Sequence, residues 1–214
     1  MSVKPILFNT EMVRAILDGR KTCTRRVIKQ NVEDILNSPF HMEHPEVEDR
    51  QIIGKLCQPP YQTGDVLYIR ETWYYESHME DRTEGEPDFP SGRYSNRHVY
   101  KADCPAYPVN IGVGEHGWKP SIHMPKEAAR IWLRVTDVRV ERLQEITDEG
   151  AEKEGYEESV DAETKFRTSA TLNFLEAWDS TIKKFDLDRY GWVANPWVWV
   201  IEFERCEKPK KVEQ

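Results

Sequence analysis

The chain has 214 residues, of which 38% are hydrophobic and 32% are charged, and its formal net charge is −8. Its seven Trp, nine Tyr and seven Phe supply enough apolar area for a core, so we expect a single domain over residues 1–214. The acidic balance argues against binding of extended duplex DNA, which needs many cations against the phosphates. The absence of an apolar run of about 18 residues and of a signal pattern predicts a cytoplasmic protein without a membrane partner.

The first half of the chain predicts one helix, two strands and a long polar segment. Residues 10–18 have the apolar spacing of a helix, which Thr10 would cap and Gly19 would end. Residues 20–28 have the composition of a strand. Prolines break the pattern over 31–60, which we expect to be an insertion that is mostly loop with one helical turn. The run 66–74 is rich in β-branched and aromatic residues and predicts a strand.

The second half predicts a further polar insertion followed by strands and helices. The insertion covers 76–117 and contains a predicted strand at 97–101. Residues 131–143 alternate as a long half-buried strand, bent near Asp137, and 197–203 form a closing strand whose Trp197 and Trp199 we expect in the core. Helices are predicted at 148–154 and 170–184, and a charged tail at 207–214. The mixture predicts an α+β fold.

The histidines and cysteines do not have the spacing of a metal site. His41 and His44 are three residues apart, and His116 and His123 could join them, but the first pair lies in a polar segment broken by prolines. This arrangement favours a solvated surface over ligation, so we predict no metal. Four cysteines, at 23, 57, 104 and 206, are too widely spaced for a disulfide framework and are expected to be free thiols.

Residues 112–117 match the letters of the Gly-x-Gly-x-x-Gly dinucleotide motif. That motif needs a helix directly after it, because the helix N-terminus binds the pyrophosphate. Pro120 and Pro125 exclude such a helix. We therefore interpret the segment as a turn and predict no cofactor.

The basic segment 19–26 is the strongest candidate for chemistry, with four cations and two threonine hydroxyls in an acidic chain. Repulsion from neighbouring arginines favours the neutral form of Lys21, which could then remove the proton of the Thr24 hydroxyl for acyl transfer. Glu154 is a candidate to orient the lysine. In an ideal strand Lys21 and Thr24 point to opposite faces, so Lys21 must come from the turn before the strand. From these residues alone, a solvated cationic edge strand is the preferred interpretation.

A second group combines aromatic and polar side chains. In the segment 118–125, Lys119, Ser121 and His123 could bind a nucleobase, or Trp118 could simply anchor the loop. On the strand 66–74, the Glu71 carboxylate could accept a hydrogen bond from a base or pair with an arginine, and pairing is preferred.

Three segments, 16–26, 63–73 and 120–125, resemble the ASCH-domain superfamily, in particular its larger phage and prophage members. They read Ile-Leu-Asp-Gly-Arg-Lys-Thr-Cys-Thr-Arg-Arg, Thr-Gly-Asp-Val-Leu-Tyr-Ile-Arg-Glu-Thr-Trp and Pro-Ser-Ile-His-Met-Pro. The resemblance covers roughly 5–30, 62–75, 118–156 and 195–205. It implies a PUA-like fold, a small mixed β-barrel with flanking helices, whose relatives bind RNA or modified nucleosides.

Compact members of the superfamily are amidohydrolases that remove the acetyl group of N4-acetylcytidine with a lysine, a threonine and a later glutamate. The matching residues here are Lys21, Thr24 and Glu154. Because of this match, a catalytic role for Lys21 is preferred over a solvated cationic edge strand. The resemblance thus implies an amidohydrolase for an acylated cytosine nucleoside. The residues expected around the substrate are Arg20, Arg26, Glu71, Trp73, Lys119, Ser121 and His123. The alternatives are a single-stranded RNA-binding module, with Trp73 or Trp118 stacking a base, and a ribonuclease.

Overall fold

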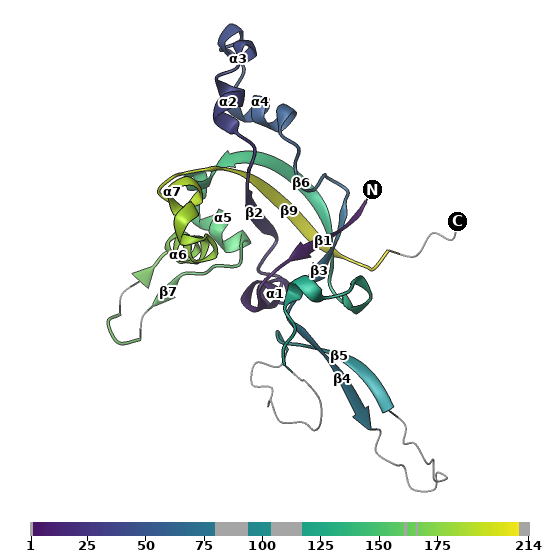
Figure 1. Ribbon diagram of the computed structural model, residues 1–214. Helices are drawn as coiled ribbons and strands as arrows, with labels where there is room; N and C mark the ends of the chain where they lie inside the picture. Colours follow the sequence, from purple (N-terminus) through teal and green to yellow (C-terminus); the bar gives the residue numbers. More distant parts are fainter. Residues whose placement is uncertain (1, 80–93, 104–116, 161, 166, 210–214) are drawn as a thin grey trace, which may run out of the picture.

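The fold is built on one mixed five-stranded sheet with the strand order β1-β3-β6-β9-β2 (Figure 1). The computed structural model describes residues 2–79, 94–103, 117–160, 162–165 and 167–209. The strands are β1 (Val3–Leu7), β2 (Cys23–Val27), β3 (Val66–Arg70), β6 (Trp132–Arg142) and β9 (Trp197–Cys206). β1 pairs with β3 in parallel, and the other neighbours are antiparallel. The predicted α+β class is confirmed.

The sheet does not close into the expected small barrel within the described residues. Its edge strands are β1 and β2, and no backbone pairing joins them in the part of the chain that the structure describes. Instead the Arg26 side chain reaches across, its Nη2 donating to the Leu7 carbonyl at 3.1 Å. Pro5 lies in β1 and has no backbone N–H, which suits β1 to an edge position.

Helix α1 (Thr10–Leu17) connects these two edge strands and sets up the turn that follows. Its N-cap is Asn9 rather than the predicted Thr10, and the Asn9 side chain accepts a hydrogen bond from the Met12 N–H at 2.8 Å. Gly19 ends the helix at φ +79°, as predicted. Because β2 begins only at Cys23, Lys21 belongs to the turn before the strand, as the sequence required.

The segment 31–60 was predicted to be mostly loop, and this is wrong. It contains α2 (Val32–Leu36), α3 (Pro39–Glu43) and α4 (Asp49–Leu56), which lie together beyond one end of the sheet in Figure 1. Pro39 begins its helix, a position where the missing N–H costs nothing. Ile52 and Ile53 of α4 are buried, so tertiary packing stabilises helices that the broken pattern hid.

The strand predicted at 66–74 is two separate strands. β3 ends at Arg70, and β4 (Trp73–Met79) forms a hairpin with β5 (Tyr94–Tyr100). This hairpin and α3 lie at opposite ends of the molecule (Figure 1). Residues 80–93 and 104–116 of the predicted insertion, which include most of the glycine-rich segment, Cys104 and His116, lie outside the described residues.

Most elements of the second half follow the prediction. The register of β6 against β9 shifts between Val135 and Asp137, which confirms the predicted bend. α5 (Asp148–Lys153) and α6 (Ala170–Thr181) match the predicted helices. The remaining short elements are η1 (Ser121–His123), η2 (Lys126–Ala128), η3 (Leu143–Glu145), β7 (Ser159–Val160), β8 (Arg167–Thr168), η4 (Lys184–Asp186) and α7 (Leu187–Tyr190).

Two apolar clusters cover opposite faces of β2 and β9. On the α1 side, Trp199 and Ile201 pack with Phe8 and Ile16. On the other side, Val198 and Val200 pack with residues of α5 and α6, among them Ala151 and Phe174. Trp199 lies in the core as predicted, whereas Trp197 is only half-buried. No helix of the described residues is long and apolar enough to cross a bilayer.

Candidate active site

Lys21 and Glu154 form a buried ion pair between the α1–β2 turn and the end of α5. The Lys21 Nζ donates to Glu154 Oε2 at 2.5 Å and to the Glu154 carbonyl at 2.9 Å. The two residues are 2% and 3% exposed. An ammonium group has three protons, so one remains for another acceptor.

Backbone contacts explain why the chain brings these side chains together. The Lys21 N–H donates to the Ala15 carbonyl at 3.0 Å, and the Thr22 N–H donates to the Lys153 carbonyl at 2.8 Å. Gly155 follows Glu154 at φ +94°, and a Cβ there would lie 2.8 Å from the Ala15 Cβ. Only glycine therefore allows α5 to end this close to α1.

Burial is the main cause that lowers the pKa of Lys21 from its ordinary 10.5. The Glu154 carboxylate opposes this effect, and Arg26 adds to it. The sequence attributed a neutral lysine to the surrounding arginines; the dominant cause is instead the loss of water around the amine. The direction agrees with that expected of a lysine that acts as a base.

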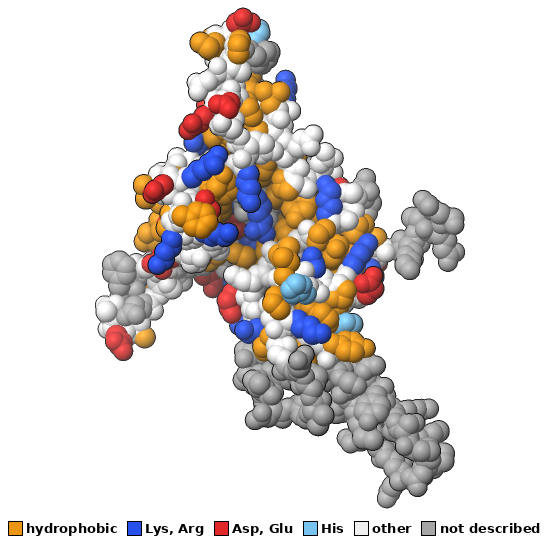
Figure 2. Space-filling view, viewed as in Figure 1, with side chains coloured by type: hydrophobic (Ala, Val, Ile, Leu, Met, Phe, Trp, Pro, Cys, Tyr) orange, Lys and Arg blue, Asp and Glu red, His pale blue; other side chains and the backbone are white. Residues whose placement is uncertain are grey.

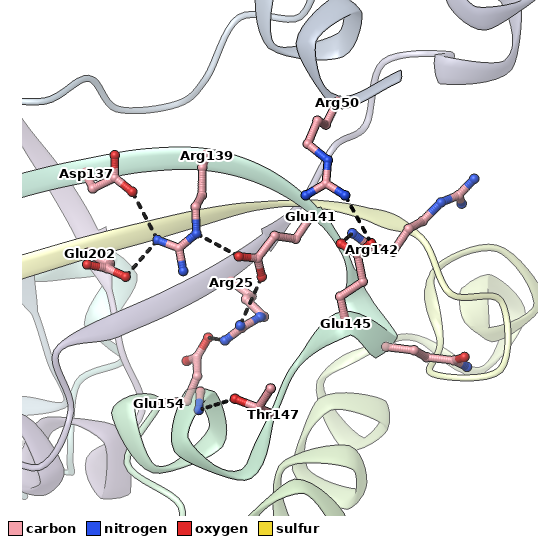
Figure 3. A network of polar contacts seen from close by, with 12 residues as sticks. Arg25, Arg50, Asp137, Arg139, Glu141, Arg142, Glu145, Thr147, Glu154 and Glu202 are labelled. Atoms are coloured by element: carbon pink, nitrogen blue, oxygen red, sulfur yellow. Dashed lines mark hydrogen bonds and ion pairs between the residues drawn. The ribbon is translucent and has the colours of Figure 1, made fainter. Parts of the chain in front are cut away.

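Arg25 extends the pair into a chain of charges that reaches the surface (Figure 3). Arg25 Nη1 lies 3.5 Å from Glu154 Oε1, and its Nη2 lies 3.2 Å from Glu141 Oε2. Glu141 is bound in turn by Arg139 at 2.7 Å, and Arg139 also pairs with Glu202 at 2.7 Å. Both oxygens of the Glu154 carboxylate thus face cations, which fixes its orientation.

The sequence analysis did not select Arg25, although a signal was present. On β2, Cys23, Arg25 and Val27 share the face that packs on α5 and α6, so a charged residue lies between two apolar ones. Arg25 is 5% exposed, and its Nε has no hydrogen-bond partner among the described residues. A buried arginine of this kind needs acidic partners from elsewhere in the chain.

Thr24 lies on the face of β2 opposite to Arg25. It is 2% exposed and pairs in register with Ile201. In the part of the chain that the structure describes, no hydrogen bond joins its hydroxyl to the lysine amine. The nucleophile and the base predicted from the sequence are thus close along the chain but are not preassembled.

Phe8 connects Lys21 to Arg26. The Lys21 Nζ and the Arg26 guanidinium each lie 5.5 Å from the centre of the Phe8 ring. Arg26 is half-buried, whereas Arg20 is exposed and engaged at the surface by the Gly155 carbonyl at 3.0 Å and by two carboxylates. Of the two predicted substrate-binding arginines, Arg26 lies beside Lys21 and Arg20 lies outside the pair.

The remaining predicted residues form a separate group around Glu71. Its carboxylate is bound by two nitrogens of Arg130, at 2.9 and 3.0 Å, and this is the arginine pairing that the sequence favoured. Burial raises the pKa of Glu71, and Arg130 opposes that rise. The backbone N–H of Phe8 donates to the Arg70 carbonyl at 3.3 Å, so Phe8 borders both groups.

Trp73 is covered and unavailable for stacking in this conformation. It is 7% exposed, with the His98 ring 5.5 Å and the Lys119 amine 5.1 Å from its ring centre. Ser121 and His123 lie on η1, where Ser121 is half-buried and His123 is exposed. These residues therefore lie near Glu71, and they do not belong to the lysine site.

The histidines of the candidate metal site are occupied by other contacts. His41 Nε2 lies 3.1 Å from Asp49, and His44 Nδ1 lies 3.2 Å from Glu46. Within the described ranges, no cluster of three or more His, Cys, Asp or Glu side chains could hold a metal ion. Cys23, Cys57 and Cys206 are free thiols, as predicted.

The chain matches no protein-family model, no curated protein and no solved structure.

Proposed function

We propose that this chain is an ASCH-type amidohydrolase with an open PUA-like fold, which removes the acyl group from a modified cytosine nucleoside such as N4-acetylcytidine. The main support is the Lys21–Glu154 pair. These residues are 133 positions apart, and the resemblance selects both as catalytic, yet their side chains meet at 2.5 Å in a buried position. The Arg26 side chain joins the edge strands β1 and β2 through the Leu7 carbonyl.

The chemistry runs through an ester of Thr24. Neutral Lys21 takes the proton of the Thr24 hydroxyl as its oxygen bonds to the acyl carbon. The bond from that carbon to the exocyclic nitrogen of cytosine then breaks, and Lys21 returns the proton to the leaving amine. Water hydrolyses the ester, releases the carboxylic acid and restores the hydroxyl. Lys21 must turn away from Glu154 to reach Thr24 during this cycle.

Burial and the Glu154 carboxylate act on the charge state of the lysine. A carboxylate at hydrogen-bond distance favours the protonated amine, while burial favours the neutral amine. Arg25 competes with Lys21 for the same carboxylate. Burial and the Glu154 carboxylate thus act in opposite directions on the pKa of Lys21, and a group that both takes and returns a proton must reach both charge states.

Substrate access requires a movement of Arg26. Lys21 and Thr24 are each 2% exposed, so a nucleoside cannot reach them without displacing a side chain. Arg26 is half-buried and holds the Leu7 carbonyl at the sheet edge. Its release would open the region around Phe8, and its guanidinium could then bind the cytosine carbonyl.

The test compares Thr24 of β2 with Thr22 of the turn before it. Thr24 is buried, and Thr22 is exposed two residues earlier. Thr24→Val removes the hydroxyl at nearly constant volume and should lower cytidine release from N4-acetylcytidine by at least about 100-fold. Thr22→Val should keep the wild-type rate. Equal rates for both variants, measured by chromatography of the product, would rule out Thr24 as the nucleophile.

A second candidate, single-stranded RNA binding, is favoured by arginines without acidic partners. Arg26, Arg142 and Arg189 form no ion pair with a carboxylate in the described part of this acidic chain. RNA affinity should then fall steeply with added salt. A ribonuclease would need His123 near Lys21; no contact among the described residues joins them, and product analysis distinguishes this reaction.

A further inference from the structure

A polar pocket of about 370 Å³ lies at the end of β2 remote from Lys21. It is formed by the residues after β2, by α2, and by the segment from α7 to the start of β9. Its lining includes Gln30, Asn31, Arg142, Arg189, Tyr190 and Trp197. Figure 2 shows Lys and Arg side chains gathered over β2 and toward α7 on this face. We name it the Arg142 pocket.

Two arginines of this pocket are not neutralised by carboxylates. Arg142 donates to the Asn195 carbonyl at 3.0 Å and lies 4.2 Å from the Trp197 ring centre. Arg189 lies 5.1 Å from the ring of Tyr190. Neither forms an ion pair within the described ranges, and Glu33 is the one acidic residue of the lining. The pocket is therefore locally cationic and suits an anion.

Several arginines elsewhere in the fold are instead paired with carboxylates. Arg25, Arg130 and Arg139 are each held by at least two carboxylates. With 38 acidic residues against 30 basic ones, acidic partners are abundant. Two unneutralised arginines lining one pocket thus leave room for a negative charge that comes from outside the chain.

Trp197 adds a hydrogen-bond donor without an acceptor. Its Nε1 is buried and has no partner among the described residues. A buried donor left unpaired is destabilising, and a ligand oxygen would remove this cost. A phosphate oxygen or a base carbonyl provides such an acceptor, and Tyr190 supplies an aromatic surface for a base.

The geometry of β2 connects this pocket to the lysine site. Alternation along β2 places the side chains of Thr24, Arg26 and the next residue of that series, Ile28, on the same face. The Ile28 N–H donates to the Trp197 carbonyl at 3.0 Å. Ile28 itself lines the pocket. Four residues of strand span about 13 Å, a distance that a few nucleotides cover. Arg26, which also forms no ion pair with a carboxylate among the described residues, lies between Thr24 and Ile28.

We propose that the Arg142 pocket binds the phosphate and base of a nucleotide that neighbours the acylated cytidine in single-stranded RNA. This inference rests on the proposed function, and it extends the substrate from the free nucleoside to acylated cytidine within a single strand. Arg142 and Arg189 bind the phosphate, and Trp197 donates to the bound nucleotide through its Nε1–H.

Fluorescence anisotropy with a labelled single-stranded RNA octamer tests the pocket without using turnover. The double variant Arg142→Gln with Arg189→Gln should weaken binding at least about tenfold and reduce the slope of log K against log salt by about 0.7, the value for one phosphate on a single strand. Arg205→Gln, an exposed arginine at the far end of β9, serves as the matched control and should bind as the wild type. Trp197→Phe keeps a ring but removes the N–H donor, and it should weaken binding by a smaller factor.

The two proposals fail separately. If the wild type neither releases cytidine from N4-acetylcytidine nor removes the acetyl group of an acetylated octamer, the proposed function is refuted. If the double variant binds the octamer as tightly as the wild type, the pocket proposal is overturned whether or not the protein is an enzyme. The supporting result is a double variant that cleaves the free nucleoside at the wild-type rate but loses affinity for the octamer and activity on it.

Discussion

Replacing Glu154 with Gln is the sharpest test of the buried charge arrangement. The substitution preserves size but removes the carboxylate that faces the Lys21 Nζ at 2.5 Å and Arg25 Nη1 at 3.5 Å. Loss of one partner from a buried ion pair costs about 3–5 kcal/mol. A cost of about 4 kcal/mol lowers the midpoint of thermal unfolding by roughly 8–16 °C in a domain of this size. Lys21→Met should cost less, because Glu154 then keeps Arg25.

The pH dependence of this destabilisation identifies its cause. Burial already lowers the pKa of Lys21 below 10.5, and Glu154→Gln removes the main effect that opposes the lowering. Above the folded-state pKa, the unfolded chain binds more protons than the folded one until about pH 10.5. The stability of the variant therefore rises with pH in that window, by up to about 1.4 kcal/mol per unit.

Urea unfolding followed by tryptophan fluorescence measures both effects at pH 7 and pH 9.5. Glu149→Gln is the matched control, since Glu149 is an exposed carboxylate on the same helix, paired with Lys153 at 2.8 Å. The control should stay close to the wild type at both pH values. An equal loss of stability in both variants, or a loss in Glu154→Gln that does not shrink as the pH rises, would refute the buried-pair reasoning.

Three further predictions concern the surroundings of the site. Gly155→Ala should cost about 1–3 kcal/mol in urea unfolding, because its Cβ would lie 2.8 Å from a side-chain carbon of α1. Gly19→Ala has open space around it and should cost only about 1 kcal/mol of backbone strain. Burial tends to raise the pKa of Asp65, but hydrogen bonds, the largest from Lys4, lower it below 3.8. The ionised carboxylate therefore stabilises the fold above that pH, and this stabilisation is lost on acidification. In Asp65→Asn, the free energy of unfolding should accordingly fall less steeply as the pH is lowered. Burial raises the pKa of Cys23 to about 12, so its alkylation by iodoacetamide at pH 8 should be far slower in the folded protein than in denaturant, as peptide mass spectrometry would report.

Local periodicity was sufficient for the elements that bury one face. The amphipathic pattern of α1, the alternation of β6 and the apolar run of β9 each predicted the element to within a few residues. The three helices of 31–60 could not be predicted this way, because they are short and depend on packing. The break after Arg70 was also hidden, since it results from a contact of the Arg70 side chain with the Met124 carbonyl at 2.8 Å, more than fifty residues away.

For the candidate site, the sequence predicted which residues carry charge but not how they are arranged. Lys21 and Glu154 were selected by the resemblance, and they lie together. Glu71 and Trp73 were selected with them but form a separate group, because the chain turns away after β3. Arg25 was missed, since its acidic partners come from distant elements and leave no short-range pattern.

The most direct test of the proposed activity is cytidine release from N4-acetylcytidine by the wild type and by Lys21→Met. The methionine fills the volume of the lysine stem without an amine, and urea unfolding verifies that the variant is folded. The account predicts release by the wild type and a loss of about 100-fold or more in the variant. Release at the wild-type rate without the Lys21 amine would contradict the proposed mechanism. If neither protein deacetylates the nucleoside or an acetylated octamer, the amidohydrolase itself is contradicted.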